Sequence, residues 1–174
     1  MRKLATIRKV DAIKPIEGAD AIELAIFGGW QVVVKKAQEI KPGMLVVYCE
    51  IDSVFPQKPE YEFLRQDKFR LRTKKFRGAL SQGLVFKVEE VIKDGNFKEG
   101  DDVTELLGIT LYEPPIPAAI SGEVAGPYPS SVPKTDEERV QNIDVADFYE
   151  INFFVTEKLD GTSCSFILDE NGFH

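Results

Sequence analysis

The sequence predicts a mainly β chain whose amino-terminal part, residues 1–108, folds as a small barrel. Short apolar runs rich in β-branched residues recur in this part, and turns containing glycine or proline separate them. Its helical signal, Asp101–Leu107, comes near the end. Short strands with frequent turns and a late helix are typical of a closed β-barrel. The predicted strands are Leu4–Val10, Ile22–Phe27, Trp30–Lys35, Met44–Ile51, Phe69–Lys75 and Leu84–Val88.

Two turn signals connect the middle strands. Gly28-Gly29 separates the second and third strands by two residues and predicts a tight hairpin. Lys41-Pro42-Gly43 precedes the fourth strand and predicts a turn, because proline fixes φ and glycine tolerates positive φ. Five or six strands joined in this way indicate a barrel of the OB type, a fold that commonly binds nucleic acids.

The composition changes after Gly108 and indicates a Pro-rich linker over residues 109–142. Leu111–Lys134 holds six of the ten prolines and has no usable periodicity, which is typical of an extended, semi-rigid connection. Thr135 and Glu138 have capping-box spacing, which predicts a short helix at the end of the linker.

Residues 143–174 are predicted to begin a second domain. Two apolar runs, Ile151–Val155 and Cys164–Leu168, are predicted strands, and Asn171-Gly172 predicts a hairpin. Because only Phe173 and His174 follow this turn, we expect the chain to contain only the first part of that domain.

The composition limits the class of protein. A hydrophobic fraction of 43% and a charged fraction of 29% are those of a soluble globular protein. No apolar run approaches the roughly 20 residues of a membrane span, and the amino terminus lacks a signal-peptide core. We therefore expect a cytoplasmic or nuclear protein that is not secreted and has no membrane partner. Cys49 and Cys164 lie in apolar runs without CxxC spacing, which predicts buried, reduced thiols. The single histidine, His174, excludes histidine-based triads.

Positive charge is concentrated in one segment of an acidic chain. The net charge is −7, but residues 65–77 carry +6 and leave −13 for the rest. Such a strip predicts a local phosphate-binding surface, whereas the alternative is a solvated, charged edge strand. Phe69 and Phe76 beside it could stack on bases or pack in the core. The predicted nucleic-acid contacts are Arg70, Arg72, Lys74, Lys75 and Arg77, the first three alternating with Leu71 and Thr73 along one strand face.

Lys158 lies between a run of β-formers and a glycine turn, in Thr156–Ser163. A lysine amine is a nucleophile only when deprotonated, so its ordinary pKa of about 10.4 must fall by roughly three units, about 4 kcal/mol. A divalent cation or neighbouring cationic groups would lower this pKa, whereas a polyanionic nucleotide alone would raise it. Asp160, two residues further on, could hold such a cation or its waters. The alternative is a surface lysine that enters a turn.

Lys158–Gly161 resembles the Lys-x-Asp-Gly motif of covalent nucleotidyltransferases, the superfamily of ATP-dependent DNA and RNA ligases and messenger-RNA capping enzymes. Together with Arg77–Leu84 (RGxxSQGL) and Lys134–Asn142 (KTDExRVQN), it makes the chain similar to the amino-terminal part of ATP-dependent RNA ligases of the Deinococcus and Naegleria type. Those enzymes place an OB module before an α+β nucleotidyltransferase domain, whereas ATP-dependent DNA ligases and capping enzymes place it after. The domain order therefore favours an RNA ligase.

This resemblance implies a site for ATP and for Mg²⁺ or Mn²⁺. Lys158 would carry AMP covalently, and Asp160 would hold the metal through water. Glu157 would contact the adenine amine, and Arg139 would reach the triphosphate or the departing pyrophosphate. The implied nucleotide-binding positions are Thr156, Glu157, Gly161 and Arg139.

The resemblance implies that the parent enzyme seals 3′-OH and 5′-phosphate RNA ends in RNA repair, with a nicked duplex as partner. The later arginine, glutamates and lysine pair of the family are missing from the 174 residues, so the chain alone is expected to be inactive in sealing. Two alternatives stay open. A capping enzyme or DNA ligase relative would share the lysine chemistry. A stand-alone OB module that binds RNA or tRNA would account for Pro15–Glu23 (PxxGADxxE), which is faintly similar to tRNA-binding OB domains.

Overall fold

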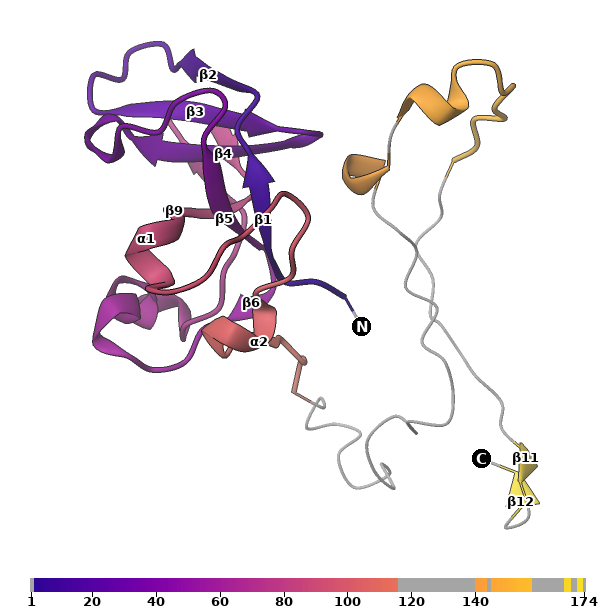
Figure 1. The fold of residues 1–174 in the computed structure, drawn as a ribbon. Helices are drawn as coiled ribbons and strands as arrows, with labels where there is room; N and C mark the ends of the chain where they lie inside the picture. Colours follow the sequence, from indigo (N-terminus) through magenta and orange to yellow (C-terminus); the bar gives the residue numbers. More distant parts are fainter. Residues whose placement is uncertain (1, 116–139, 144, 158–167, 170–171, 174) are drawn as a thin grey trace. The chain divides into compact units, whose positions relative to one another are not determined.

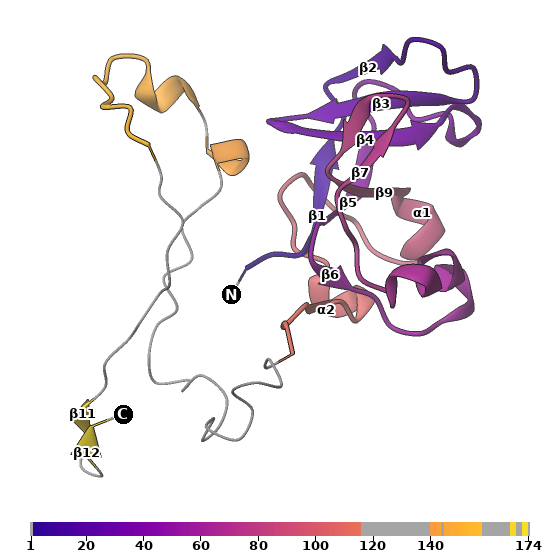
Figure 2. The same cartoon turned by 180° about the vertical axis from the view of Figure 1, so that it is seen from behind.

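The computed structural model describes residues 2–115, 140–143, 145–157, 168–169 and 172–173. The chain has two compact units, Met1–Ile143 and Asp144–His174. The first unit is a β-barrel with short helices around it (Figure 1, and from behind in Figure 2).

Two three-stranded antiparallel sheets form the barrel. The first sheet consists of β1 (Ala5–Lys9), β5 (Leu45–Glu50) and β9 (Gly83–Lys87), with β5 in the centre. The second consists of β2 (Ala12–Pro15), β3 (Ile22–Phe27) and β4 (Trp30–Lys35), with β3 in the centre. Five of the six predicted strands are thereby confirmed to within one residue at each end, and β2 was not predicted.

One bent stretch of chain joins the two sheets at the first corner of the barrel. The amide of Val10 donates to the Met44 carbonyl beside the first sheet (2.9 Å), and the next amide, that of Asp11, donates to the Ile26 carbonyl of the second sheet (2.8 Å). The chain therefore passes from β1 into β2 and belongs to both sheets.

The opposite corner closes between β4 and the residues before β9. The amide of Gln82 donates to the Gln31 carbonyl (2.9 Å), and the amide of Val33 donates to Ser81 Oγ (3.1 Å). With β5 paired to both β1 and β9, the ring of strands is complete. This closed five-membered ring, counting β1–β2 as one strand, is the predicted OB-type architecture.

The core has two layers that meet at β5. Val46 and Tyr48 pack inside the barrel with Trp30, whereas Val47 and Cys49 pack on the other face of the strand. Because both of its faces are buried, β5 is a continuous apolar run and does not alternate. The outer layer is completed by residues from the helical segments outside the barrel, which include Tyr61, Leu64 and Leu107.

The connection between β5 and β9 differs from its prediction. The 3₁₀ helix η2 (Pro59–Asp67) ends with Lys68 at φ 55° and Phe69 at φ 59°, a left-handed conformation that a strand cannot contain. The predicted strand Phe69–Lys75 is therefore wrong over most of its length, and only β7 (Lys74–Phe76) forms, paired with β8 (Ala79–Ser81). The other short elements of the first unit are η1 (Lys36–Gln38), β6 (Ser53–Val54), α1 (Val88–Val91), α2 (Thr104–Leu107), β10 (Thr110–Leu111) and η3 (Val140–Asn142).

The predicted helix Asp101–Leu107 is confirmed for its last four residues, α2. It begins late because the Asp102 carboxylate accepts hydrogen bonds from the amide (2.9 Å) and the hydroxyl (2.6 Å) of Thr104. A side chain that binds the backbone two residues on favours a turn over a helix at its own position.

The second unit contains η4 (Val145–Phe148), a segment without regular secondary structure over 151–157, and the hairpin β11 (Leu168–Asp169) and β12 (Gly172–Phe173). The predicted strand Ile151–Val155 is not formed, because no described strand pairs with it and Phe154 and Val155 are each 96% exposed. The predicted hairpin is confirmed, with Gly172 paired to Asp169 and therefore inside β12. Except for Leu168, the predicted strand Cys164–Leu168 lies outside the described residues, as does the Thr135–Glu138 capping box.

Across the part of the chain that the structure describes, no helix is long and apolar enough to cross a bilayer.

Candidate nucleic-acid interface

Most of the predicted adenylation residues lie outside the described residues. This is true of Lys158, Asp160, Gly161 and Arg139. Thr156 and Glu157 are described and exposed, at the end of the segment 151–157 of the second unit. Within the described ranges, no group of three or more His, Cys, Asp or Glu side chains is arranged to hold a metal. The nucleotide and metal sites therefore stay predictions.

Three cations of the basic segment are anchored by carboxylates. Arg70 donates from Nε (3.1 Å) and Nη2 (2.7 Å) to Asp52 Oδ1, and its guanidinium lies 3.6 Å from the centre of the Tyr112 ring. Its side chain is only 24% exposed. The other anchored pairs are Arg65–Glu62, in which the hydrogen bond lowers the pKa of Glu62 and raises that of Arg65, and Lys74–Asp67.

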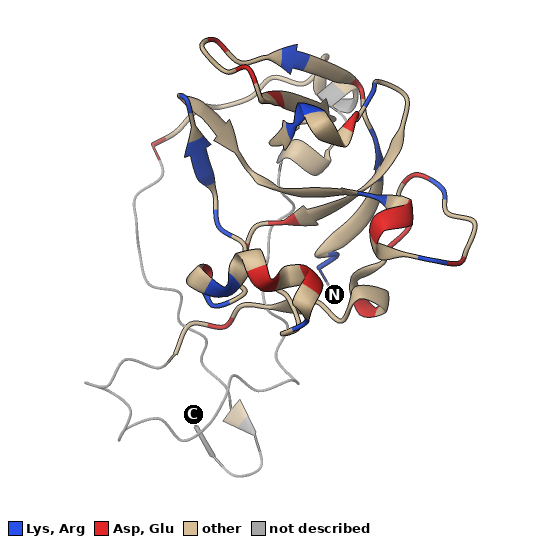
Figure 3. Cartoon of the chain, turned by 90° about the vertical axis from the view of Figure 1, so that its left-hand side faces the viewer, with Lys and Arg blue, Asp and Glu red and all other residues tan. Residues whose placement is uncertain are grey.

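The remaining cations of the segment are exposed and are not anchored in this way. Lys68, Arg72, Lys75 and Arg77 take part in no ion pair among the described residues. Figure 3 shows that Lys and Arg positions are interspersed with Asp and Glu positions along the ribbon of the barrel and its loops. The segment therefore divides into an anchored set and a free set, although the sequence shows one cluster.

The β7–β8 hairpin positions the second half of the segment. Its turn contains Arg77 (φ 48°) and Gly78 (φ 86°), and two positive φ angles give the turn a twist that matches that of the strands. Buried Ser81 fastens the hairpin to the barrel through its hydrogen bond with the Val33 amide. Side chains alternate along a strand, so Lys74 and Phe76 share one face and Lys75 lies on the other.

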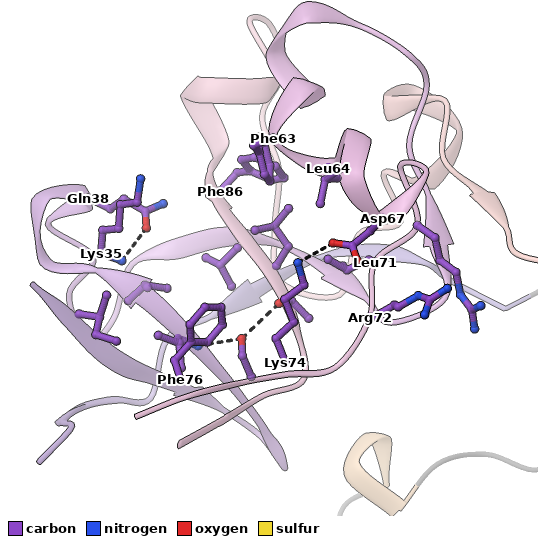
Figure 4. A pocket seen from close by; sticks show the side chains of 18 of the residues that line it. Lys35, Gln38, Phe63, Leu64, Asp67, Leu71, Arg72, Lys74, Phe76 and Phe86 are labelled. Carbon is purple, nitrogen blue, oxygen red and sulfur yellow. Dashed lines mark hydrogen bonds and ion pairs between the residues drawn. The ribbon is translucent and has the colours of Figure 1, made fainter. Parts of the chain in front are cut away.

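A cavity of about 500 Å³ lies beside this hairpin (Figure 4). It is bounded by the end of β4, by η1 and η2, by the β7–β8 hairpin and by β9. Figure 4 shows Phe63 and Phe86 close together, with Phe76 on a separate part of the lining, and the Lys74–Asp67 ion pair beside them. The charged residues of the lining are Lys35, Asp67, Arg70, Arg72, Lys74 and Glu90.

Residues 140–143 pack on the barrel at the β3–β4 turn. Asn142 Oδ1 accepts hydrogen bonds from Trp30 Nε1 (2.9 Å) and Arg8 Nη2 (3.2 Å). A Cβ on Gly29 would lie 2.8 Å from Gln141 Cα, so only glycine permits this approach. The end of the predicted linker is therefore clamped to the barrel, and these contacts are called the Asn142 clamp below.

The sequence interpretation missed several of these residues. Phe63 lies in η2, which was not predicted, and Lys35 ends a predicted strand with no sign that it borders a cavity. Asn142 belongs to a segment that the sequence identified, but its partner Trp30 lies 112 residues away. Phe69, predicted either to stack or to pack, is 5% exposed and packs in the core.

Comparison with known families identifies the barrel. Residues 4–88 match the sequence model of an OB-fold domain. The amino-terminal part of the chain is therefore an OB-fold domain, as the strand pattern predicted.

Solved structures of an RNA ligase from Naegleria gruberi are similar to the chain. The structure with pyrophosphate shares 45% sequence identity and has a TM-score of 0.68, and the match covers 82% of this chain and 44% of that one. A mutant with AMP and manganese shares 45% identity at a TM-score of 0.69, covering 81% and 44%. A mutant with ATP and manganese shares 44% identity at a TM-score of 0.67, also covering 81% and 44%.

The chain resembles the amino-terminal part of these RNA ligases, as its motifs indicated, and it spans 44% of the length of each of these three structures. No curated protein matches the chain.

Proposed function

We propose that the chain is the amino-terminal part of an ATP-dependent RNA ligase, which seals 3′-OH and 5′-phosphate RNA ends through AMP held covalently on Lys158. The observation that carries this proposal is the 45% identity to an RNA ligase over 82% of the chain. The Lys-x-Asp-Gly motif at 158–161 supports the covalent chemistry.

Lys158 is the nucleophile of the first step. Its deprotonated amine attacks the α-phosphate of ATP, a P–N bond forms, and the bond from the α-phosphorus to the pyrophosphate oxygen breaks. The amine proton leaves to solvent. Arg139 stabilises the departing pyrophosphate, because a cation placed where negative charge develops lowers the barrier. Glu157 contacts the adenine amine, and Thr156 and Gly161 complete the nucleotide contacts.

Asp160 holds the waters of Mg²⁺ or Mn²⁺. A carboxylate suits these hard cations, which prefer oxygen ligands and keep several waters. When bound, the cation supplies charge neutralisation at the phosphates and favours the neutral lysine amine. The manganese in structures of the related RNA ligase supports the use of a divalent cation.

RNA, as a nicked duplex, is held by the basic segment of the barrel. Arg72, Lys75 and Arg77 are exposed, so in this proposal they are the residues that contact phosphates directly. Arg70 and Lys74 contribute positive potential, since carboxylates already hold them. The 174 residues span 44% of the length of the related RNA ligase, and we expect no sealing by them alone.

Intact-mass measurement of the full-length parent after incubation with ATP and manganese tests the proposal. We expect one adenylyl adduct, which Lys158→Ala abolishes and Lys75→Ala, a matched change in the barrel, retains. Absence of an adduct with both magnesium and manganese would overturn the proposal. An adduct from GTP in place of ATP indicates a capping relative, and sealing of nicked DNA in preference to nicked RNA indicates a DNA ligase relative.

A stand-alone OB module that binds RNA is the second candidate, because the barrel closes and buries its core without the second unit. It predicts RNA binding by the 174-residue chain together with an unmodified full-length parent. The mass measurement therefore separates the two functions.

A further inference from the structure

We propose that the cavity beside the β7–β8 hairpin binds an unpaired RNA base, with the flanking phosphates on Arg72 and Lys35. The inference rests on the proposed function, in which RNA is the partner. The cavity adds a single-stranded contact, one unpaired base, to the nicked duplex that the basic segment holds.

The walls of the cavity are aromatic and accessible. Phe63 is 56% exposed and Phe76 is 41% exposed. Near Phe63, the partly buried Phe86 lies 6.3 Å from Phe55 and 6.2 Å from Tyr61, measured between ring centres, so its position is fixed by the core. Bases of any identity gain affinity by stacking on such side chains. Rings exposed at a cavity are therefore suited to a flat, uncharged base.

The charges of the cavity leave cations available to phosphates. Its two carboxylates are already engaged, since Asp67 is paired with Lys74 and Glu90 accepts a hydrogen bond from the Lys87 amide (3.1 Å). Arg72 and Lys35 take part in no ion pair within the described ranges. An apolar floor with cations at its border matches a nucleotide, whose base is apolar on its faces and whose phosphates are anionic.

The place of the cavity in the barrel supports the same occupant. OB barrels bind oligonucleotides on their second and third strands and on the loop between the fourth and fifth. Here those strands are β3 and β4, and that loop is the stretch between β5 and β9, which holds η2 and the β7–β8 hairpin. The lining combines Ile22 of β3 and Val33 of β4 with Phe63 and Phe76 from this loop.

The occupant must be unpaired. A base inside a duplex is stacked on both faces and cannot present them to phenyl rings, whereas a base in a single strand can. A volume of about 500 Å³ is within the range of roughly 300–1,000 Å³ of small-ligand sites and is large enough for a single base with part of its sugar.

Fluorescence anisotropy of the 174-residue chain with a labelled single-stranded RNA, and with the same RNA annealed to its complement, tests the proposal. For the double variant Phe63→Ala/Phe76→Ala we expect at least about 10-fold weaker binding of the single strand, with duplex binding changed less than about 2-fold. Leu80→Ala is the matched control, because Leu80 is 37% exposed in the same hairpin, pairs with Lys75 and is not part of the lining. The single variant Phe76→Tyr, in which Phe63 is unchanged, keeps both aromatic rings and should bind the single strand as tightly as the wild type. Equal urea midpoints show that the variants fold.

Unchanged single-strand affinity in the double variant would overturn the proposal and leave the cavity to another partner, such as an apolar peptide. Equal losses for single strand and duplex would also overturn it, since a base pocket must discriminate between them. Neither result affects the ligase proposal, which depends on the adduct at Lys158.

Discussion

The anchored and free cations of the basic segment have the same charges and nearly the same place in the sequence, but the structure uses them differently. Arg70 joins the chain after η2 to Asp52 and Tyr112, and Lys74 joins β7 to Asp67. Arg72, which lies between these two anchored residues, and Lys75, which follows Lys74, are exposed to solvent. The positive cluster of this sequence is therefore partly anchored by carboxylates and partly free at the surface. The carboxylate partners distinguish the two sets.

Removing the main anchored cation should have the largest effect on stability. Arg70→Ala loses two hydrogen bonds to a carboxylate and the contact with the Tyr112 ring, so we expect the free energy of unfolding to fall by about 2 kcal/mol. The estimate is moderate because the pair is partly exposed. Urea denaturation measures it, with Arg72→Ala as the control. Similar losses in both variants would mean that the anchored and free sets do not differ.

The second largest effect on stability should come from high pH, which acts on the buried thiol of Cys49. Burial raises the pKa of Cys49 far above its ordinary value. The pKa of Tyr61 is also raised, mainly by burial and to a smaller extent by electrostatic repulsion from Cys49 and Glu60. Below about pH 8.5 the thiol is protonated in both states, so it adds no pH dependence. Above that value the unfolded chain releases the proton and the folded chain retains it, so stability should decline by about 1.4 kcal/mol per pH unit for this thiol.

Cys49→Ala is the control for this pH dependence. The variant should be less stable at neutral pH, because the side chain is fully buried, but its stability should decline less steeply with rising pH. Urea denaturation at several pH values gives the slopes. Equal slopes in the two proteins would contradict a protonated, buried Cys49.

The Asn142 clamp should contribute less to stability, because Asn142 itself is exposed. Asn142→Ala removes the acceptor of the Trp30 and Arg8 hydrogen bonds, and we expect a loss of about 1 kcal/mol in the docking of residues 140–143. Trp30 is the single tryptophan of the chain, so its emission spectrum and its indole N–H resonance report the clamp directly. Asn96→Ala changes an exposed asparagine elsewhere and should leave both signals unchanged.

Gly29→Ala approaches the same contact from the barrel side. Its added Cβ would lie 2.8 Å from Gln141 Cα, so it should change the Trp30 signals in the same direction as Asn142→Ala. Emission that responds to neither substitution would show that these residues do not pack on the β3–β4 turn.

The barrel strands could be predicted because their signals are local. The turns at Gly28-Gly29 and Lys41-Pro42-Gly43 are confirmed, the latter with Gly43 at φ 87° and a hydrogen bond from the Met44 amide to the Lys41 carbonyl (3.1 Å). The prediction failed at Phe69–Lys75, where alternation of charge suggested a strand. Lys68 and Phe69 adopt a left-handed conformation although neither is a glycine, so the sequence gives no sign of it. Burial of Phe69 in the outer core outweighs the local pattern.

The strand predicted before Lys158 failed for a different reason. Ile151–Val155 has the composition of a buried strand, but a strand exists only when another strand accepts its hydrogen bonds. No described strand of the second unit lies beside it, and its apolar side chains are exposed. The candidate interface, in turn, depends on contacts between residues far apart in sequence, such as Gln31 with Leu80, which no local pattern encodes.

Neutralising the free cations should have the smallest effect on stability. The triple variant Arg72→Gln/Lys75→Gln/Arg77→Gln removes side chains that form no ion pair within the described ranges, so we expect the free energy of unfolding to change by less than about 0.5 kcal/mol. RNA binding should respond instead, because each cation that no longer neutralises a phosphate lowers the slope of log affinity against log salt by about 0.7 for single strands. Affinity measured over a range of salt concentrations, with Lys93→Gln as a control on the exposed loop after α1, gives this slope. An unchanged slope would mean that the free cations are only solvated surface, whereas a reduced slope with unchanged stability would establish that the segment has two roles.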